Sequence, residues 1–241
     1  MAEALLSLAG VNTHIGQYHI LQGVDFEVPR AGLTMLLGRN GAGKTTTLRT
    51  IMGLWKASAG AIRYDGMEIT RTPTPELAQL GIAYVPENMG IFAGLTVKEN
   101  LLLAARSGPP DEKRLDWIFK LFPAMQKFWN GLAGNLSGGQ KQMLAVSRAI
   151  VEPRKLLLVD EPTKGLAPSI ISNMIGAFKE LKGSETALLV VEQNFHFARA
   201  LGDTVAVMDS GRIVHTGSMA ALAADEQLQT RFLGLSLESH Q

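Results

Sequence analysis

Eight consecutive residues, Gly38-Arg39-Asn40-Gly41-Ala42-Gly43-Lys44-Thr45, match the pattern G-x-x-x-x-G-K-[ST]. Glycines let a loop turn tightly, so that several backbone N–H groups converge on phosphate oxygens. Lys44 is suited to reach the β- and γ-phosphates of a nucleotide, and the Thr45 hydroxyl is suited to bind Mg²⁺. The apolar run before the loop and the helical run that continues through Thr46 are the context the pattern requires. This segment therefore predicts a phosphate cradle rather than an accidental glycine-rich turn.

Two adjacent acids, Asp160 and Glu161, end the apolar run 156–159. The carboxyl end of a buried strand is the edge at which α/β sheets bind ligands. Asp160 is suited to hold Mg²⁺ through water, and Glu161, pointing the other way, is suited to polarise an attacking water as a general base. Two acids at a strand end are by themselves more typical of a solvated turn. The phosphate cradle is what favours the catalytic interpretation.

A third segment, Leu136-Ser137-Gly138-Gly139-Gln140, opens a predicted helix. Ser137, Gly138 and Gly139 bring little side-chain bulk to a helix N-terminus, which is a second place where an anion can bind. One nucleotide needs only one phosphate cradle, so a second anion site requires a separate explanation. The simpler alternative is that Ser137 is an ordinary helix cap.

The elements that must hold these segments alternate along the chain. Apolar runs predict strands at 24–28, 33–37, 82–85, 155–159, 187–191 and 204–208. Helical patterns occupy 44–52, 139–151, 170–181 and 195–201. Alternating strands and helices indicate an α/β fold. The last four strands are almost entirely apolar, which predicts burial on both faces of a mostly parallel sheet.

The alternation stops between residues 88 and 136, where we find helical patterns at 97–105 and 111–121 but no convincing strand. Proline and glycine punctuate this region. We expect one domain over residues 1–241, with a catalytic core formed by 1–87 and 156–241. The intervening residues, about 88–155, are expected to form an inserted helical subdomain that includes the helix after Ser137.

Composition narrows the classes of function. The chain has 241 residues, 46% of them hydrophobic, and a net charge of +1, so it has no bulk field with which to bind nucleic acid. It has no cysteine and therefore neither disulfides nor thiolate metal sites. Its apolar runs are far shorter than the ~20 residues that span a bilayer, and its first residues do not read as a signal peptide. Any membrane attachment is expected to come through a partner.

The pentapeptide 136–140 resembles the signature of ABC (ATP-binding cassette) ATPases, and the order of segments matches that family from about residue 5 to residue 234. The resemblance implies a P-loop NTPase (RecA-like) core with an N-terminal antiparallel β portion, and ATP and Mg²⁺ as cofactors. It implies that Ser137, Gly138, Gly139 and Gln140 close on ATP held by a second cassette, either a sister chain or a copy of this one. It also implies transmembrane permease subunits, an extracytoplasmic solute-binding protein that acts indirectly, and a peripheral place on the cytoplasmic face of the inner membrane.

Four positions depart from the family pattern. Glu87 stands where the family has the Q-loop glutamine; it can still meet Mg²⁺ or water, but it adds a negative charge. Gln193 stands where a switch histidine is usual; it can donate a hydrogen bond to a γ-phosphate but cannot carry a proton. Ala167 replaces a common aspartate of the D-loop. Ile15 occupies the place of an aromatic residue that stacks on adenine, which implies weaker stacking unless Tyr18 substitutes.

Taken together, Pro86-Glu87, the segment 165–168 and the segment 191–194 resemble one branch of the family, the ATPases of importers for branched-chain amino acids and related amides or urea. Within that branch the chain is similar to the shorter of two cassettes that usually form a heterodimer. The sequence leaves three alternatives open: an ABC exporter ATPase, a soluble ABC ATPase acting on nucleic acid or the ribosome, and a P-loop kinase or GTPase. The last has no use for residues 136–140.

Overall fold

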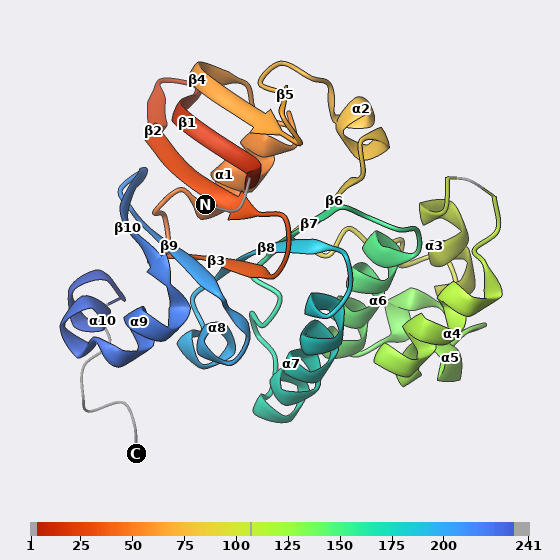
Figure 1. Cartoon of the computed structure of the whole chain (residues 1–241). Coiled ribbons are helices and arrows are strands. Elements are labelled where there is room, and N and C mark those ends of the chain that lie inside the picture. The colour runs from red at the N-terminus through yellow and green to blue at the C-terminus, as the bar shows by residue number, and fades with distance from the viewer. Residues whose placement is uncertain (1–3, 107, 234–241) are drawn as a thin grey trace.

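The computed structural model describes residues 4–106 and 108–233 (Figure 1). Its strands are β1 (Ala4–Ile15), β2 (Tyr18–Pro29), β3 (Leu33–Leu37), β4 (Ala57–Tyr64), β5 (Met67–Glu68), β6 (Ile82–Val85), β7 (Leu156–Asp160), β8 (Ala187–Glu192), β9 (Thr204–Asp209) and β10 (Arg212–Ser218). Its helices are α1 (Lys44–Ile51), α2 (Thr74–Gln79), α3 (Val97–Ala104), α4 (Glu112–Leu121), α5 (Pro123–Lys127), α6 (Gly138–Ile150), α7 (Pro168–Lys182), α8 (Phe195–Leu201), α9 (Met219–Ala224) and α10 (Glu226–Leu233), with one short 3₁₀ turn, η1 (Ala133–Asn135).

The larger sheet has the strand order β10-β9-β3-β8-β7-β6. Its strands β6, β7, β8, β3 and β9 pair in parallel, and β10 pairs antiparallel with β9. Every residue of β3, β7 and β8 is buried. The α/β class with a mostly parallel sheet, predicted from the nearly all-apolar runs, is therefore confirmed.

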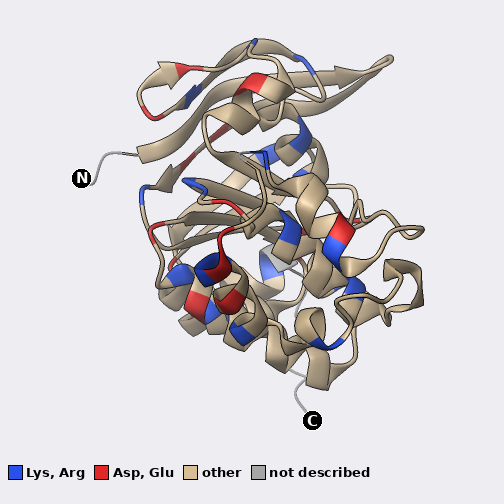
Figure 2. Cartoon of the chain, turned by 90° about the vertical axis from the view of Figure 1, so that its right-hand side faces the viewer, with Lys and Arg blue, Asp and Glu red and all other residues tan. Residues whose placement is uncertain are grey.

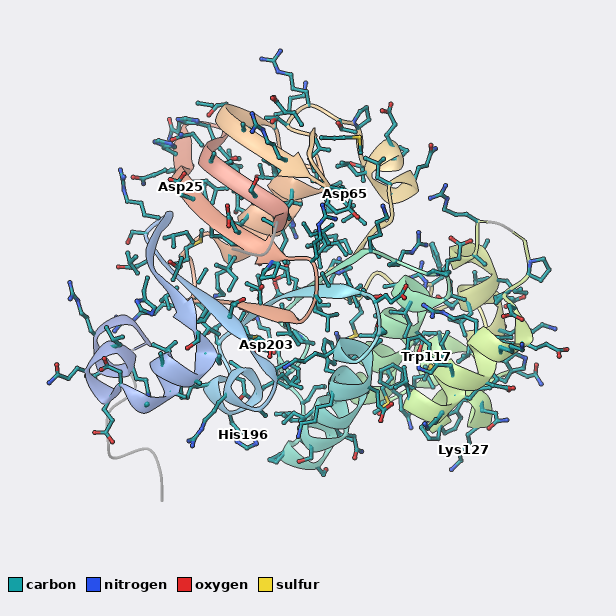
Figure 3. The ribbon with its side chains drawn as sticks, in the orientation of Figure 1. Asp25, Asp65, Trp117, Lys127, His196 and Asp203 are labelled. Atoms are coloured by element: carbon teal, nitrogen blue, oxygen red, sulfur yellow. The ribbon has the colours of Figure 1, made fainter. Side chains whose placement is uncertain are left out.

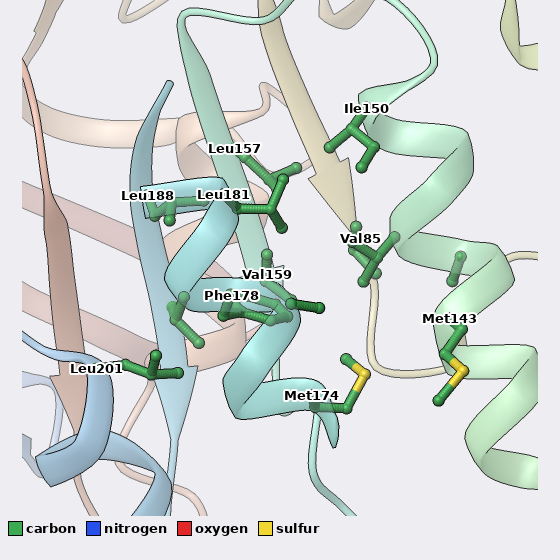
Figure 4. Packing of buried hydrophobic residues seen from close by; sticks show 14 of the residues in the cluster. Val85, Met143, Ile150, Leu157, Val159, Met174, Phe178, Leu181, Leu188 and Leu201 are labelled. Carbon is green, nitrogen blue, oxygen red and sulfur yellow. The ribbon is translucent and has the colours of Figure 1, made fainter. Parts of the chain in front are cut away.

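These strands are apolar throughout because each contributes side chains to two hydrophobic cores, one on either face of the sheet. Successive side chains of a strand point to opposite faces. In β7, Leu157 and Val159 pack with helices α6, α7 and α8, and Figure 4 shows Phe178 of α7 beside Val159 and Leu181 of α7 beside Leu157. Leu156 and Leu158 belong to the other core, which the smaller sheet and α1 complete. Replacing either set by polar residues would leave one layer without a core.

The smaller sheet is antiparallel, with the order β2-β1-β4-β5, and lies over α1 on the far side of the larger sheet from α7 and α8 (Figure 1). It confirms the antiparallel N-terminal portion. Of its residues, the sequence pattern predicts only 24–28 as strand, within β2. In β1 and β4 buried and exposed positions are mixed, because one face of the sheet is open to solvent. Such a mixed pattern is a much weaker sequence signal for a strand than an unbroken apolar run.

The described residues between 88 and 136 contain helices and one isolated bridge, Thr96 with Leu132, but no named strand, as predicted. The Thr96 side chain caps α3 through a capping box with Glu99. Helix α6 contacts α3, α5 and strand β6, so it joins this region to the larger sheet. Basic and acidic residues are interspersed on the face seen in Figure 2. Among the residues described, no helix is long and apolar enough to cross a membrane.

Candidate functional site

Strand order brings the predicted site segments to one edge of the larger sheet. Strands β3, β8, β7 and β6 are neighbours and run parallel, so their carboxyl ends lie together. Leu37 pairs with Glu192, and Asp160 pairs with Val191. The loop after β3, the residues after β8, the acids that end β7 and the segment after β6 therefore form one continuous edge.

The loop between β3 and α1 adopts a conformation that depends on glycine. Gly41 and Gly43 have φ angles of 80° and 108°, in the left-handed region that other residues rarely adopt. A side chain at Gly38 would place its Cβ 2.2 Å from the backbone oxygen of Met208. The N–H of Gly211 donates to the oxygen of Ala42 at 2.9 Å, which ties the loop to the turn between β9 and β10. The helix that follows has no side-chain cap, which suits an N-terminus that receives an anion.

Lys44, the first residue of α1, folds back over its own loop. Its Nζ donates to the backbone oxygens of Gly38 and Arg39 at 2.9 and 3.1 Å, and lies 3.5 Å from Oε1 of Glu161. The side chain is only 4% exposed. Burial lowers the pKa of Lys44, and the charge of Glu161 opposes that shift. A phosphate entering the loop would give this buried ammonium a stronger partner than two carbonyls.

Thr45 and Asp160 face each other across the strand edge. The Thr45 hydroxyl donates to Oδ1 of Asp160 at 3.0 Å, and the Tyr84 hydroxyl donates to Oδ2 at 3.2 Å. Asp160 is fully buried, and burial raises its pKa, while these two hydrogen bonds act in the opposite direction. A hydroxyl and a carboxylate are the hard oxygen ligands that Mg²⁺ prefers. Among the described residues no group of three or more His, Asp or Glu side chains could hold a metal, so an ion here would depend on phosphate oxygens and water as well.

Glu161 is held from more than one side. Its φ angle is 46°, uncommon for a residue with a side chain, and its N–H donates to the oxygen of Val191 at 2.9 Å. Gln193 Nε2 donates to Glu161 Oε1 at 2.6 Å and to Asn40 Oδ1 at 2.6 Å. Gln193 thus connects the phosphate loop with the predicted general base. His196, the nearest histidine in sequence, lies on α8 on the side of the sheet opposite α1 (Figure 3).

Glu87 lies just past β6, at the same edge, but its contact differs from the one expected of a metal ligand. Its Oε1 pairs with Lys164 Nζ at 2.5 Å, and the same ammonium lies 3.7 Å from Oε2 of Glu161. The Thr45 hydroxyl donates its hydrogen bond to Asp160 and not to Glu87. In the sequence Lys164 belongs to the D-loop segment 163–168, but nothing there links position 164 to position 87.

Ser137, Gly138, Gly139 and Gln140 start α6 and contact their own helix and α7. The Ser137 hydroxyl accepts from the N–H of Gln140 at 3.3 Å, and Gln140 Oε1 accepts from the N–H of Ser137 at 2.9 Å. A Cβ at Gly139 would lie 2.6 Å from Cγ2 of Ile170, whereas one at Gly138 would meet nothing within 4 Å. The helix cap, our simpler alternative, is therefore present, and it leaves Gly138 facing open space.

Ile15, the residue expected beside adenine, pairs with Tyr18 across the hairpin between β1 and β2. Tyr18 is 65% exposed, so its ring is accessible on that hairpin. Next to this pair His14 and His19 stack, with ring centroids 4.2 Å apart. The structure therefore brings an aromatic side chain directly opposite the position where the sequence lacks one.

Two further residues support the site and were missed in the sequence. The buried Glu192 accepts hydrogen bonds from the Thr163 N–H at 2.9 Å and the Thr163 hydroxyl at 2.7 Å, and from the N–H of Gln193 at 2.9 Å. Burial raises the pKa of Glu192, and these hydrogen bonds oppose the shift. Glu192 thereby binds the segment after β7 to the end of β8. The sequence feature that could have identified Glu192 is an acidic residue at the end of the otherwise apolar run 187–191.

The chain is similar to ATPases of known transporters. A family model described as ABC transporter matches residues 21–164. The high-affinity branched-chain amino acid transport ATP-binding protein BraG of Pseudomonas aeruginosa is 38% identical, covering 95% of this chain and 100% of that protein. A probable branched-chain amino acid transport ATP-binding protein, LivF of Archaeoglobus fulgidus, is 34% identical, covering 96% and 99%. A solved ATP-binding cassette of an ABC transporter has a TM-score of 0.81 and 25% identity, covering 98% and 100%.

Proposed function

Because the chain belongs to the ABC transporter family of ATP-hydrolysing cassettes, we propose that it powers the import of branched-chain amino acids or related small amide or carboxylate solutes. The observation that carries this proposal is the identity of 38% to BraG over nearly the full length of both chains. The arrangement of the strand edge agrees with ATP hydrolysis, since phosphate loop, buried acids and a hydrogen-bonding switch residue lie together there.

Residues of the loop and of α1 bind the nucleotide in this proposal. The backbone N–H groups of residues 38–46 surround the β- and γ-phosphates, and Lys44 leaves the oxygens of Gly38 and Arg39 to pair with them. Thr45 and Asp160 would hold Mg²⁺, which when bound neutralises charge that develops on the transferred phosphoryl group. Ile15 and Tyr18, on the hairpin between β1 and β2, would contact the adenine ring of the nucleotide.

Hydrolysis requires a water molecule in line with the γ-phosphate. Glu161 accepts the proton of that water, and Gln193 keeps the carboxylate in place. The second N–H of Gln193, which now donates to Asn40, would have to leave that oxygen to bind the γ-phosphate. Departure of Lys44 toward the phosphates removes a positive charge that now lies 3.5 Å from Oε1 of Glu161, while Gln193 still donates to that oxygen. Loss of this cation makes Glu161 a stronger proton acceptor when ATP binds. Glu87 lies at the side of this site, where it pairs with Lys164.

The remaining parts of the proposal concern partners. Gly138 faces open space at the start of α6, which suits approach of a second cassette whose ATP the residues 137–140 would contact. The working unit would be two cassettes bound to transmembrane permease subunits at the cytoplasmic face of the membrane. An extracytoplasmic solute-binding protein would deliver the solute to the permease.

Uptake of radiolabelled leucine tests the proposal in cells of the source organism that lack this gene. We expect the wild-type chain to restore uptake and the Glu161→Gln chain not to restore it, although both bind ATP. A chain that hydrolyses ATP but leaves the uptake of leucine, isoleucine and valine unchanged would refute the assignment to branched-chain amino acids. Accumulation of an exported molecule in the deletion strain would instead favour the exporter alternative.

A further inference from the structure

Lys164 lies close to carboxylates of two different segments, the one after β6 and the one after β7. Its Nζ lies 2.5 Å from Glu87 Oε1, in the segment after β6, and 3.7 Å from Glu161 Oε2 at the end of β7. The two carboxylates lie in the segments that follow two neighbouring parallel strands of the larger sheet. The ammonium thus occupies the position between them, where it compensates negative charge on both sides.

The backbone that carries Lys164 is firmly held. The N–H of Lys164 donates to the oxygen of Glu161 at 3.2 Å, closing a turn directly after β7. The preceding residue, Thr163, is bound through both its N–H and its hydroxyl to the buried carboxylate of Glu192. The backbone of Lys164 is therefore fixed relative to the sheet edge, even though its side chain is 57% exposed.

Negative charge at this edge of the sheet favours a cation at position 164. Glu87, Asp160 and Glu161 place three carboxylates beside the loop that must accept the negative charge of ATP. Lys44 is buried against Glu161 and is committed to the phosphates once ATP binds. Without Lys164, Glu87 would add an uncompensated negative charge close to the nucleotide, at a position where a glutamine would add none.

We propose that Lys164 is a positioning residue for ATP hydrolysis, whose ammonium neutralises Glu87 and holds it beside Glu161 at the edge of the phosphate site. This inference rests on the family's ATPase activity and on the proposed role of Glu161, and it extends that role to a residue outside the phosphate loop. Lys164 acts through Glu87 and Glu161; it does not touch the reacting atoms.

The test is a double-mutant cycle on the full-length chain with Lys164→Met, Glu87→Gln and the two combined. The affinity for a fluorescent ATP analogue is measured in EDTA at low and at high salt, and turnover is measured with Mg²⁺. We expect Lys164→Met to weaken binding about two- to five-fold, the scale of an exposed ion pair, and more so at low salt. Glu87→Gln in the same chain should restore the wild-type affinity, because a neutral amide needs no counter-charge. Lys164→Arg should bind like wild type.

Lys155→Met is the matched control, since Lys155 is equally exposed, at 62%, and pairs with Asp65 at 2.8 Å, away from the site. Equal affinities of the Lys164→Met and Lys155→Met chains would overturn the inference. So would a double variant as weak as Lys164→Met alone, because the lost affinity would then not depend on the charge of Glu87. A wild-type chain that bound no ATP would overturn the activity itself, and that result is distinct from the other two.

Discussion

The side-chain amide of Gln193 joins Glu161 to Asn40, donating to an oxygen of each at 2.6 Å. One residue at the end of β8 thus sets the position of the proposed general base relative to the phosphate loop. A glutamine can do this because its amide offers two N–H donors and does not itself titrate.

Gln193→Ala should lower the turnover of ATP about 10- to 100-fold, because Glu161 loses its fixed donor and misplacement of a catalytic group has costs of this order. The Michaelis constant for ATP should change much less, since the backbone of the phosphate loop remains. Steady-state ATPase kinetics would measure both. Gln126→Ala, at an exposed position of α5, is the control and should behave like wild type. A loss confined to the Michaelis constant would contradict the role assigned to Gln193.

Glu161→Gln should reduce turnover by about 10²–10⁴-fold while ATP still binds. The amide has the size of the carboxylate but cannot accept a proton, and the loss of one negative charge favours binding of phosphate. Single-turnover hydrolysis and equilibrium binding of ATP separate the two effects. Glu180→Gln, an exposed substitution on α7, is the control. Normal hydrolysis by Glu161→Gln would show that another group acts as the base.

Stability should depend on pH through Asp160. Burial raises the pKa of Asp160, so at this site the folded chain binds a proton more tightly than the unfolded chain. The free energy of unfolding therefore falls as pH rises from about 4, the ordinary pKa, through the raised pKa, and then stays level. Asp160→Asn removes this penalty and should raise the melting temperature near neutral pH by about 2–4 °C, the effect of ~1 kcal/mol in a domain of this size.

Thermal unfolding of both chains in EDTA, followed across this pH range, checks the prediction. The melting temperature of Asp160→Asn should exceed that of the wild-type chain at neutral pH, and the difference should shrink toward acid pH. A difference that stays constant with pH would attribute the effect to altered hydrogen bonds with Thr45 and Tyr84 rather than to charge.

The two glycines at the start of α6 should differ in what they affect. Gly139→Ala brings a Cβ to within 2.6 Å of Ile170 and should cost about 1–3 kcal/mol of stability, which Ile170→Ala should partly restore. Gly138→Ala meets nothing in the chain and should leave thermal stability unchanged or slightly higher. Gly138→Ala should nevertheless lower ATP turnover once the chain is paired with a second cassette. Full ATPase activity of a cassette dimer that carries Gly138→Ala would contradict the proposed contact with the partner's ATP.

Thr163→Val should destabilise the chain by about 1.5–3 kcal/mol, the scale of a lost hydrogen bond to a buried charged group. Valine has nearly the shape of threonine, so the change isolates the hydroxyl that Glu192 accepts. Denaturant unfolding measures the effect, and Thr163→Ser, which keeps the hydroxyl, is the control. Equal midpoints for valine and threonine would show that the backbone N–H of residue 163 satisfies Glu192 without the side chain.

Much of the fold could be predicted because its signals are local. The runs 156–159 and 187–191 are apolar at every position, and the structure buries both completely between two cores. Helix α8 has the predicted bounds, and α6 and α7 differ from prediction by one or two residues, since Ser137 and Pro168 start them earlier. Strands β4 and β10 were missed, because exposed positions interrupt their patterns.

The sequence by itself determined the phosphate loop, the acids that end β7 and the α/β class, since each depends on residue types within one short segment. Tertiary structure alone decided which side chains meet. Gln193 is 153 residues from Asn40, and Lys164 is 77 residues from Glu87. Those pairs exist because β3, β8, β7 and β6 are neighbours in the sheet, and strand order follows from long-range packing that no local pattern encodes.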